Sequence, residues 1–185
     1  MIEKKSKILQ DDEIKVILVD RKNQSLGLED KIKAHRKGQL HRAFSVMLYN
    51  PAGEMLIQRR ALSKYHSPGL WANTCCGHPL PAEETREAAR RRLWEELGFA
   101  CDLQARTHVL YFLRVDHGMI EHEYVQVYEA EVSDACFALN PDEVMDVNWM
   151  TPLKIREDVK RNPQNYTRWF RLYLLKYFDK VFRQK

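Results

Sequence analysis

Apolar and polar residues follow two different periods along the chain. Stretches rich in β-branched and aromatic residues, bounded by turn residues, predict six strands, at 14–19, 43–49, 55–58, 107–115, 119–130 and 142–149. Helical spacing predicts helices after Pro81, after Pro152 and at 166–182, and the polar segment 29–37 is helical or irregular. Strands that alternate with helices, without a glycine-rich dinucleotide loop, predict an α/β or α+β sandwich.

The helix predicted after Pro81 has two distinct sides. Its apolar stripe, with residues four apart, consists of Ala89, Leu93 and Leu97. A charged side, with spacings of three and four residues, consists of Arg92, Glu95 and Glu96. Gly98 is well placed to end the helix. The two glutamates on their own are equally typical of a solvated helix face.

The strand at 119–130 has an unusual pattern of charge. Residues two apart on a strand point to the same face, so Glu121 and Glu123 project together with Val125 and Val127. Two carboxylates on an otherwise apolar face are costly unless they are paired or bind a metal. The alternative is a strand at the exposed edge of the sheet.

Composition restricts the class of protein. A chain of 185 residues with 44% hydrophobic and 30% charged residues, and without repeats or linkers, predicts one globular domain over residues 1–185. A net charge of +4 gives no argument for nucleic-acid binding. No apolar run approaches the roughly 20 residues that span a bilayer, and the first seven residues lack an apolar signal core, so we expect a cytoplasmic protein. Four unevenly spaced cysteines predict reduced thiols.

The residues that carry chemistry concentrate between Trp71 and Gly98. A thiol, a glycine turn and an imidazole lie within three residues, at Cys76, Gly77 and His78. Gly77 and Glu83, followed by Arg91-Arg92-Leu93-Trp94-Glu95-Glu96-Leu97-Gly98-Phe99, resemble the Nudix signature, which implies a loop–helix–loop over Gly77–Phe99 beside a mixed sheet between helices. Nudix hydrolases carry a glutamate at the position of Arg92. This difference removes one carboxylate from the face that would hold catalytic magnesium, and so argues against pyrophosphate hydrolysis.

A narrower resemblance covers residues 31–169. The motifs that carry it are Ala34-His35, Leu40-His41-Arg42-Ala43-Phe44-Ser45, Arg59-Arg60-Ala61-Leu62-Ser63-Lys64, Trp71-Ala72-Asn73-Thr74-Cys75-Cys76-Gly77-His78-Pro79, Glu121-His122-Glu123 and Asp142-Glu143-Val144-Met145. In this order they resemble the type I isopentenyl-diphosphate isomerases, Nudix-fold enzymes that do not hydrolyse their diphosphate. The resemblance implies isomerisation of isopentenyl diphosphate to dimethylallyl diphosphate in isoprenoid biosynthesis, with Arg92 as a phosphate ligand.

The same resemblance implies a metal site of three imidazoles and two carboxylates. The matching positions are His35, His41, His78, Glu121 and Glu123. Nitrogen and oxygen ligands of this kind suit manganese, zinc or iron better than calcium, and we expect Mn²⁺ or Zn²⁺. The other histidines, which have no matching position, are interpreted as structural: His66, His108, His117 and His122.

The implied chemistry moves a double bond. An unactivated alkene is a poor base, so a well-placed acid must protonate it and the tertiary carbocation must be stabilised. The family's acid/base groups match Cys76 and Glu123, with Tyr111 assisting Glu123. Trp169 is the candidate for a cation–π wall; the alternative is a core residue of the last helix. Cys76 is chosen over Cys75 because it directly precedes Gly77 and His78, and Cys75 is expected to be a buried filler.

The diphosphate needs cations and hydrogen-bond donors. The positions that match the family's phosphate contacts are Lys31, Arg60, Lys64 and Arg92. Glu96 and the backbone carbonyl of Cys76 match the ligands of a Mg²⁺ ion that bridges to the diphosphate. Two alternatives remain beside the isomerase: a Nudix pyrophosphohydrolase of nucleoside diphosphate derivatives and a non-catalytic Nudix-like binding module. The expected partner is a small molecule, without nucleic acid or membrane, and the protein is a monomer or a homodimer.

Overall fold

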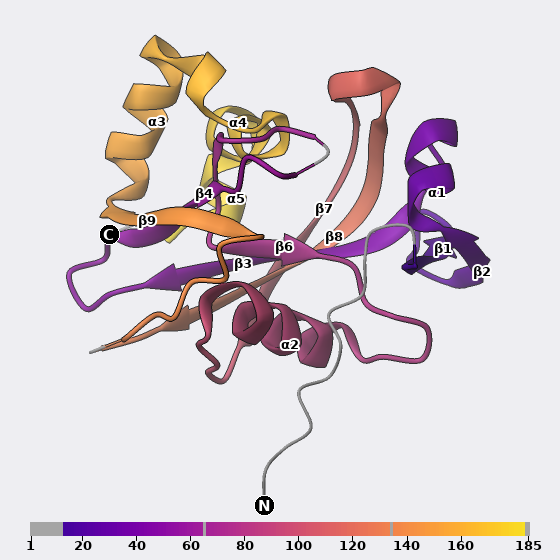
Figure 1. Cartoon of the computed structure of the whole chain (residues 1–185), viewed down its shortest axis with the longest axis horizontal. Helices are drawn as coiled ribbons and strands as arrows, with labels where there is room; N and C mark the ends of the chain where they lie inside the picture. Colours follow the sequence, from indigo (N-terminus) through magenta and orange to yellow (C-terminus); the bar gives the residue numbers. More distant parts are fainter. Residues whose placement is uncertain (1–12, 65, 134, 184–185) are drawn as a thin grey trace, which may run out of the picture.

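A computed structural model describes residues 13–64, 66–133 and 135–183 (Figure 1). Its strands, which form one mixed sheet, are β1 (Lys15–Val19), β2 (Ser25–Asp30), β3 (His41–Tyr49), β4 (Met55–Arg60), β5 (Trp71–Ala72), β6 (Cys75–Gly77), β7 (Gln104–Arg114), β8 (Ile120–Glu131) and β9 (Val144–Met150). Its helices are α1 (Lys31–Lys37), α2 (Thr85–Leu97), α3 (Pro152–Arg161), α4 (Arg168–Lys176) and α5 (Phe178–Val181). Short 3₁₀ turns lie at Asp116–Gly118 and Pro163–Asn165.

Strand β3 is at the centre of the sheet. It pairs in parallel with β8 along its whole length, and antiparallel with β6 at residues 44–46. Shorter pairings join its first residue to β1 and its last to β4, whose far side carries β5 and β9. β7 adds an antiparallel strand outside β8. The chain therefore brings segments 80 residues apart in sequence onto neighbouring strands at β3 and β8.

Alternation along β3 divides the core into two layers. Ala43, Met47 and Tyr49 are buried in the cluster that includes the residues of α3, α4 and α5. The intervening Phe44, Val46 and Leu48 are buried in a second cluster with the apolar stripe of α2. Side chains of successive strand residues point to opposite faces, so the sheet lies between α2 and the carboxyl-terminal helices, as Figure 1 shows. The predicted mixed sheet between helices is confirmed.

Some elements differ from those predicted. The short strands β5 and β6 were not predicted, and β3 begins at His41, two residues earlier than expected. The segment 166–182 is not one helix, because Tyr177 adopts φ −117° and ψ 24° between α4 and α5. The expectation about a signal core concerns residues that lie outside the described part of the chain. No helix of the described residues is long and apolar enough to cross a membrane.

Gly98 ends α2, as predicted. It adopts the left-handed conformation (φ 59°, ψ 25°), and its N–H donates to the carbonyl of Trp94. A Cβ atom at this position would lie 2.7 Å from the Cβ of Ala138 and 2.8 Å from its carbonyl oxygen. Both the backbone conformation and the space therefore require glycine.

We expect Gly98→Ala to lower the free energy of unfolding by about 2–4 kcal/mol, from left-handed strain together with overpacking. Urea unfolding measures this change. Gly118→Ala is the matched control, because Gly118 also has positive φ (70°) but open space around a built Cβ. The control isolates the strain of about 1–2 kcal/mol; equal losses in the two variants would contradict the proposed clash.

Candidate active site and metal centre

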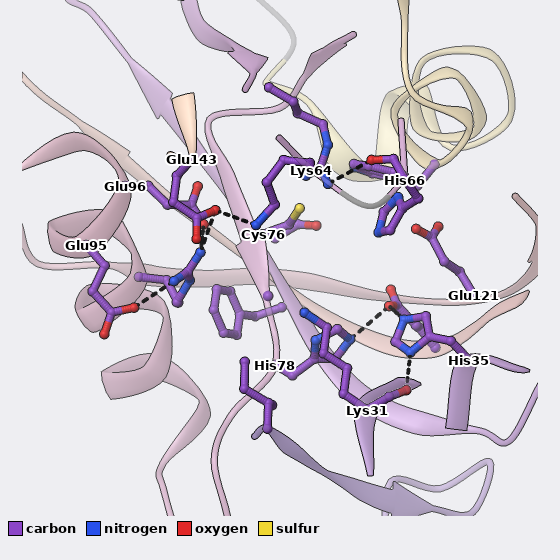
Figure 2. A pocket seen from close by; sticks show the side chains of 18 of the residues that line it. Lys31, His35, Lys64, His66, Cys76, His78, Glu95, Glu96, Glu121 and Glu143 are labelled. Carbon is purple, nitrogen blue, oxygen red and sulfur yellow. Dashed lines mark hydrogen bonds and ion pairs between the residues drawn. The ribbon is translucent and has the colours of Figure 1, made fainter. Parts of the chain in front are cut away.

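A cavity of about 290 Å³ opens beside β3, β6 and β8, between α2 and the start of α4 (Figure 2). Cationic side chains in its wall are Lys31, Arg60, Lys64, Arg91 and Arg92. Carboxylates in its wall are Glu95, Glu96, Glu121, Glu123 and Glu143. Cys76, Tyr111 and Trp169 also line it. The cavity thus combines charged groups suited to an anion and a cation with aromatic and thiol groups suited to an apolar moiety.

Strand register places three of these functional groups in one row. Glu123 of β8 pairs with His41 of β3 on one side and with Tyr111 of β7 on the other. Neighbouring strands lie about 4.7–4.9 Å apart, so paired side chains on one face meet. The hydroxyl of Tyr111 donates to Glu123 Oε2 at 2.6 Å. The sheet itself therefore holds this carboxylate between an imidazole and a phenol.

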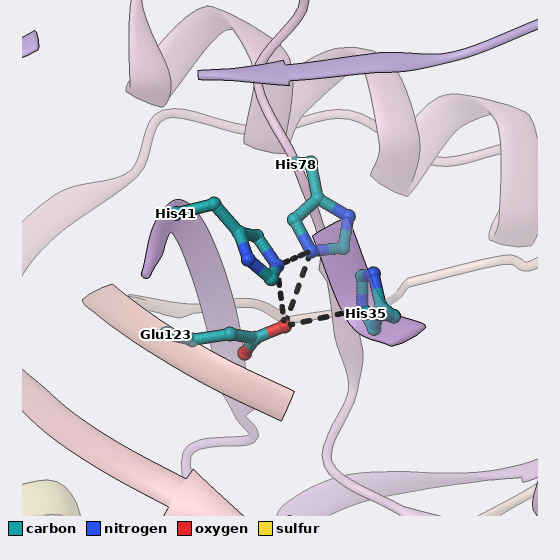
Figure 3. A group of neighbouring side chains, drawn as sticks. All are labelled: His35, His41, His78 and Glu123. Atoms are coloured by element: carbon teal, nitrogen blue, oxygen red, sulfur yellow. Dashed lines mark hydrogen bonds and ion pairs between the residues drawn. The ribbon is translucent and has the colours of Figure 1, made fainter. Parts of the chain in front are cut away.

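Two further histidines complete a compact group around Glu123 (Figure 3). One ligand atom from each of His35, His41, His78 and Glu123 lies within 4.8 Å of all the others. Glu123 Oε1 is 3.1 Å from Nε2 of His78, 3.5 Å from Nε2 of His41 and 4.0 Å from Nε2 of His35. The four residues come from α1, β3, the segment after β6, and β8. This group could hold a metal ion.

The hydrogen bonds of the imidazoles fit that use. Nδ1 of His35 is 2.8 Å from the carbonyl of Lys31, and Nδ1 of His41 is 2.8 Å from the carbonyl of Gln39. A carbonyl only accepts, so in both rings Nδ1 carries the proton and Nε2 presents a lone pair towards Glu123. Lone pairs that converge on a carboxylate oxygen repel one another unless a cation lies between them, and backbone carbonyls commonly orient metal-binding imidazoles in this way.

Burial keeps these rings neutral. Desolvation lowers the pKa of His35 to about 3, and the neighbouring His78 and His41 lower it further. Desolvation also lowers the pKa of His78 to about 4, although Glu123 acts in the opposite direction. Neutral imidazole is the form that binds a metal, so both rings are ready to coordinate at neutral pH.

Glu121, the fifth predicted metal ligand, lies outside the compact group but in the same cavity. It is 4% exposed, and its Oε2 has no hydrogen-bond partner among the described residues. Burial and the nearby Glu123 raise its pKa well above the ordinary value for glutamate. The predicted inward face of β8 is confirmed, because Glu121, Glu123, Val125 and Val127 are all buried on it. A buried carboxylate oxygen without a donor is costly, which fits a cation nearby.

The two adjacent cysteines occupy opposite faces of β6. Cys75 pairs with Val46 and is fully buried in the cluster beneath α2, whereas Cys76 pairs with Ser45 and lines the cavity. None of the chain's four cysteines is in a disulfide. Burial, reinforced by the charge of Glu96, raises the pKa of Cys76 to about 12, so the side chain carries its proton at neutral pH. The structure therefore gives the cavity one thiol, that of Cys76.

A network of ion pairs on α2 occupies the charged wall. Arg92 Nη2 lies 2.7 Å from Glu96 Oε1 and 3.1 Å from Glu143 Oε2. Glu143 also accepts from Lys64 Nζ at 2.8 Å. Glu96 is 4% exposed and accepts from Gln58 at 2.9 Å through its other oxygen. Glu143 therefore bridges two of the cations that sequence comparison assigned to the diphosphate.

The described chain resembles known proteins along most of its length. A family model described as "NUDIX domain" matches residues 39–170. An isopentenyl-diphosphate Delta-isomerase of Pectobacterium atrosepticum is 45% identical over 157 residues, which cover 85% of this chain and 87% of that protein. One of Halorhodospira halophila is 46% identical over 158 residues, covering 84% and 90%.

The chain belongs to the isopentenyl-diphosphate Delta-isomerase family, within the Nudix proteins.

Solved structures agree on the fold. A protein from Deinococcus radiodurans superposes with a TM-score of 0.74 at 21% identity, covering 91% of this chain and 99% of that one. The MutT protein from Methanosarcina mazei gives a TM-score of 0.61 at 22% identity, covering 76% and 93%. At this level of identity the likeness concerns the Nudix fold alone.

Membership of the isopentenyl-diphosphate Delta-isomerase family fits the charge pattern of α2. Arg92 stands where a Nudix hydrolase carries a glutamate, and it binds both Glu95 (2.8 Å) and Glu96 (2.7 Å). Glu83 and Arg91 pair with each other at 2.7 Å. One carboxylate fewer and one cation more make this face less suited to a cluster of magnesium ions and better suited to an anion.

Sequence reasoning missed several residues of the cavity. His66, interpreted as structural, lines it and meets the indole of Trp169 edge-on at 5.8 Å between ring centroids. Glu143 was noted only as part of a motif. Ser45 also lines the cavity and lies 3.2 Å from the hydroxyl of Tyr173. The position of His66 two residues after Lys64, in a matched block, was the one signal available for it.

Proposed function

We propose that this chain converts isopentenyl diphosphate to dimethylallyl diphosphate in isoprenoid biosynthesis. The observation that carries the proposal is that Cys76 and Glu123 line one cavity whose remaining wall is cationic. Two groups able to exchange protons, on the walls of a pocket that also fits a diphosphate, match an allylic rearrangement. They do not match hydrolysis, which needs an activated water at phosphorus.

The proposed reaction adds a proton at the terminal alkene carbon and removes another two carbons away. Cys76 and Glu123 are the acid/base pair, and Tyr111 supports Glu123 through its 2.6 Å hydrogen bond. The tertiary carbocation between the two steps is stabilised by the π face of Trp169, an interaction worth about 2 kcal/mol in a desolvated site. Trp169 is 3% exposed and belongs to the core as well as to the cavity wall.

The proposed diphosphate site consists of Lys31, Arg60, Lys64 and Arg92, all in the wall of the cavity. Glu143 holds Lys64 and Arg92 together before substrate binds. Glu96 and the backbone carbonyl of Cys76 are the proposed ligands of a Mg²⁺ ion that accompanies the diphosphate. Oxygen ligands with an incoming phosphate are typical of magnesium sites.

The proposed second metal is Mn²⁺ or Zn²⁺, held by His35, His41, His78, Glu121 and Glu123. Nitrogen-rich ligand sets favour such ions over calcium. When bound, the ion supplies positive charge that lowers the proton affinity of its carboxylate ligands. The chain's own contribution is to orient the imidazoles through the carbonyls of Lys31 and Gln39.

Incubation with isopentenyl diphosphate and Mg²⁺ in deuterated water, followed by NMR, tests the function. We expect dimethylallyl diphosphate and deuterium incorporation, without release of phosphate. The alternative, a pyrophosphohydrolase of nucleoside diphosphate derivatives, requires phosphate or nucleotide release and no deuterated product. Phosphate release without isomerisation would overturn the proposal.

Removal of metal is expected to abolish activity, because the imidazoles and carboxylates lose the cation that holds them in one place. Dialysis against a chelator, with the metal content measured before each assay, checks this. Readdition of Mn²⁺ or Zn²⁺ together with Mg²⁺ is expected to restore turnover. Full turnover in a sample shown to be free of metal would contradict the proposed metal site.

We further propose a single domain over residues 1–185 that acts in the cytoplasm on its small-molecule substrate, without a nucleic-acid or membrane partner. The choice between monomer and homodimer is open to light scattering on the purified protein. One symmetric peak of about 22 kDa would identify the monomer.

A further inference from the structure

Asn73 links two walls of the cavity through one buried side chain. It lies between β5 and β6 and is fully buried. Its Nδ2 donates to the carbonyl of Cys75 at 2.7 Å and to that of Val46 at 3.4 Å. Its Oδ1 accepts from the indole Nε1 of Trp169 at 3.1 Å, across 96 positions of sequence. A single amide therefore joins the backbone just before Cys76 to the indole on α4.

The orientation of this amide is fixed by its partners. A backbone carbonyl only accepts a hydrogen bond and an indole N–H only donates one. If the amide of Asn73 were reversed, its nitrogen would face the donor of Trp169 and its oxygen would face two carbonyls. The observed arrangement is the one in which every buried polar atom of the amide is paired.

A second link supports the same connection. The N–H of Thr167 donates to the carbonyl of Trp71 at 2.9 Å, and Trp71 forms a parallel bridge with Tyr166. The segment that leads into β6 is therefore attached to the start of α4 by backbone bonds and, through Asn73, by a side chain. The backbone bonds fix where α4 starts, but only the Asn73 amide fixes the rotation of the indole.

We infer that Asn73 is a positioning residue for catalysis, which sets the indole of Trp169 against the strand that carries the Cys76 thiol. This inference rests on the proposed function. The substrate lies between these groups, so their relative placement decides whether the π face meets the cation that protonation creates. Misplacement of a reacting group by about 1 Å can cost about 100-fold in rate.

The decisive experiment removes the indole N–H alone. Substituting β-(3-benzothienyl)alanine for Trp169 exchanges the N–H for sulfur and keeps a bicyclic aromatic ring. It is made in the wild type and in Asn73→Leu, and kcat and KM for isopentenyl diphosphate are measured. We expect each single change to lower kcat by about 10-fold to 100-fold, with KM changed less than about threefold. The double variant is expected to be no slower than the slower single variant.

Multiplicative losses in the double variant would overturn the inference, as would a loss confined to KM. If Asn73→Leu fails to fold, the benzothienyl variant alone remains decisive: unchanged kcat refutes the inference and a selective loss of kcat supports it.

Thr74→Val is the matched control. Thr74 is fully buried beside Asn73, and its hydroxyl joins the backbone of β3 and β4, at 3.0 Å from the N–H of Leu48 and 2.6 Å from the carbonyl of Leu56. We expect this variant to lose thermal stability while kcat, measured well below its Tm, stays within about threefold. A kcat loss as large as that of Asn73→Leu would reduce Asn73 to a structural role and overturn the inference.

The indole N–H resonance of Trp169, observed by ¹⁵N–¹H NMR, gives a readout independent of activity. We expect Asn73→Leu to shift it and to speed its exchange with solvent, and Thr74→Val to leave it in place. If the wild type shows no isomerase activity, the proposed function fails, and this resonance still decides whether Asn73 orients the indole. A resonance unmoved in Asn73→Leu overturns the inference.

Discussion

Cys76→Ala is expected to abolish deuterium exchange into isopentenyl diphosphate while the protein stays folded. The thiol of Cys76 is the one that the structure presents to the cavity, and the wall beside it offers no substitute for a proton exchanged on that side of the substrate. Loss of a positioned acid or base costs about 10²-fold to 10⁴-fold. We expect a fall near the upper end, because an unactivated alkene needs a strong acid. NMR in deuterated water measures the exchange.

Cys75→Ala is the control for this experiment. Cys75 is adjacent in sequence and buried, but it packs beneath α2 on the other face of β6. Its loss removes a buried sulfur, and we expect a decrease of about 1 kcal/mol in the free energy of unfolding, with exchange retained. Full exchange in Cys76→Ala would remove the thiol from the mechanism. Equal loss in both variants would point to disruption of β6 instead.

Glu123→Gln is expected to remove both metal binding and exchange. The change preserves the shape of the side chain and its ability to accept from Tyr111, but it deletes the negative charge that the imidazoles of His35, His41 and His78 surround. Without that charge, neutral imidazoles bind a divalent ion more weakly, and Glu123 no longer serves as a base. We expect at least about a 10³-fold loss of exchange, together with a metal content near zero after dialysis.

Glu129→Gln provides the comparison on the same strand. Glu129 lies on β8 and pairs with Arg106 (3.0 Å) and Arg183 (3.3 Å), and it is not among the residues that line the cavity. We expect it to lose no metal and to change the rate by less than about threefold. Stoichiometric metal and normal exchange in Glu123→Gln would show that this carboxylate is neither ligand nor base.

Predictions from local period agreed with the structure where one face of an element is buried. The alternation at 119–130 predicted that Glu121 and Glu123 point inward with the valines of β8, and all of them are buried. The apolar stripe of α2, with Ala89, Leu93 and Leu97, packs against the sheet. Burial of one face repeats every two residues in a strand and about every 3.6 in a helix, so such features are visible in sequence alone.

Elements that depend on distant pairing were missed. β5 and β6 have two and three residues, too few to show a period, and they exist because β4 and β3 supply hydrogen-bond partners. The break at Tyr177 was hidden because apolar residues continue on both sides of it. The last turn is instead held from outside, where Arg106 of β7 donates to the carbonyl of Phe182 at 2.6 Å.

The sequence by itself determined the family-like motifs, the inward carboxylates of β8 and the two-sided helix α2, because each is written in residues close together along the chain. Only the tertiary structure decided that His35, His41, His78 and Glu123 converge, that Cys76 and Cys75 face opposite layers, and that Asn73 binds the indole of Trp169. The physical reason is register: β3 and β8 must align His41 with Glu123, and no local pattern encodes which residue of one strand pairs with which of another.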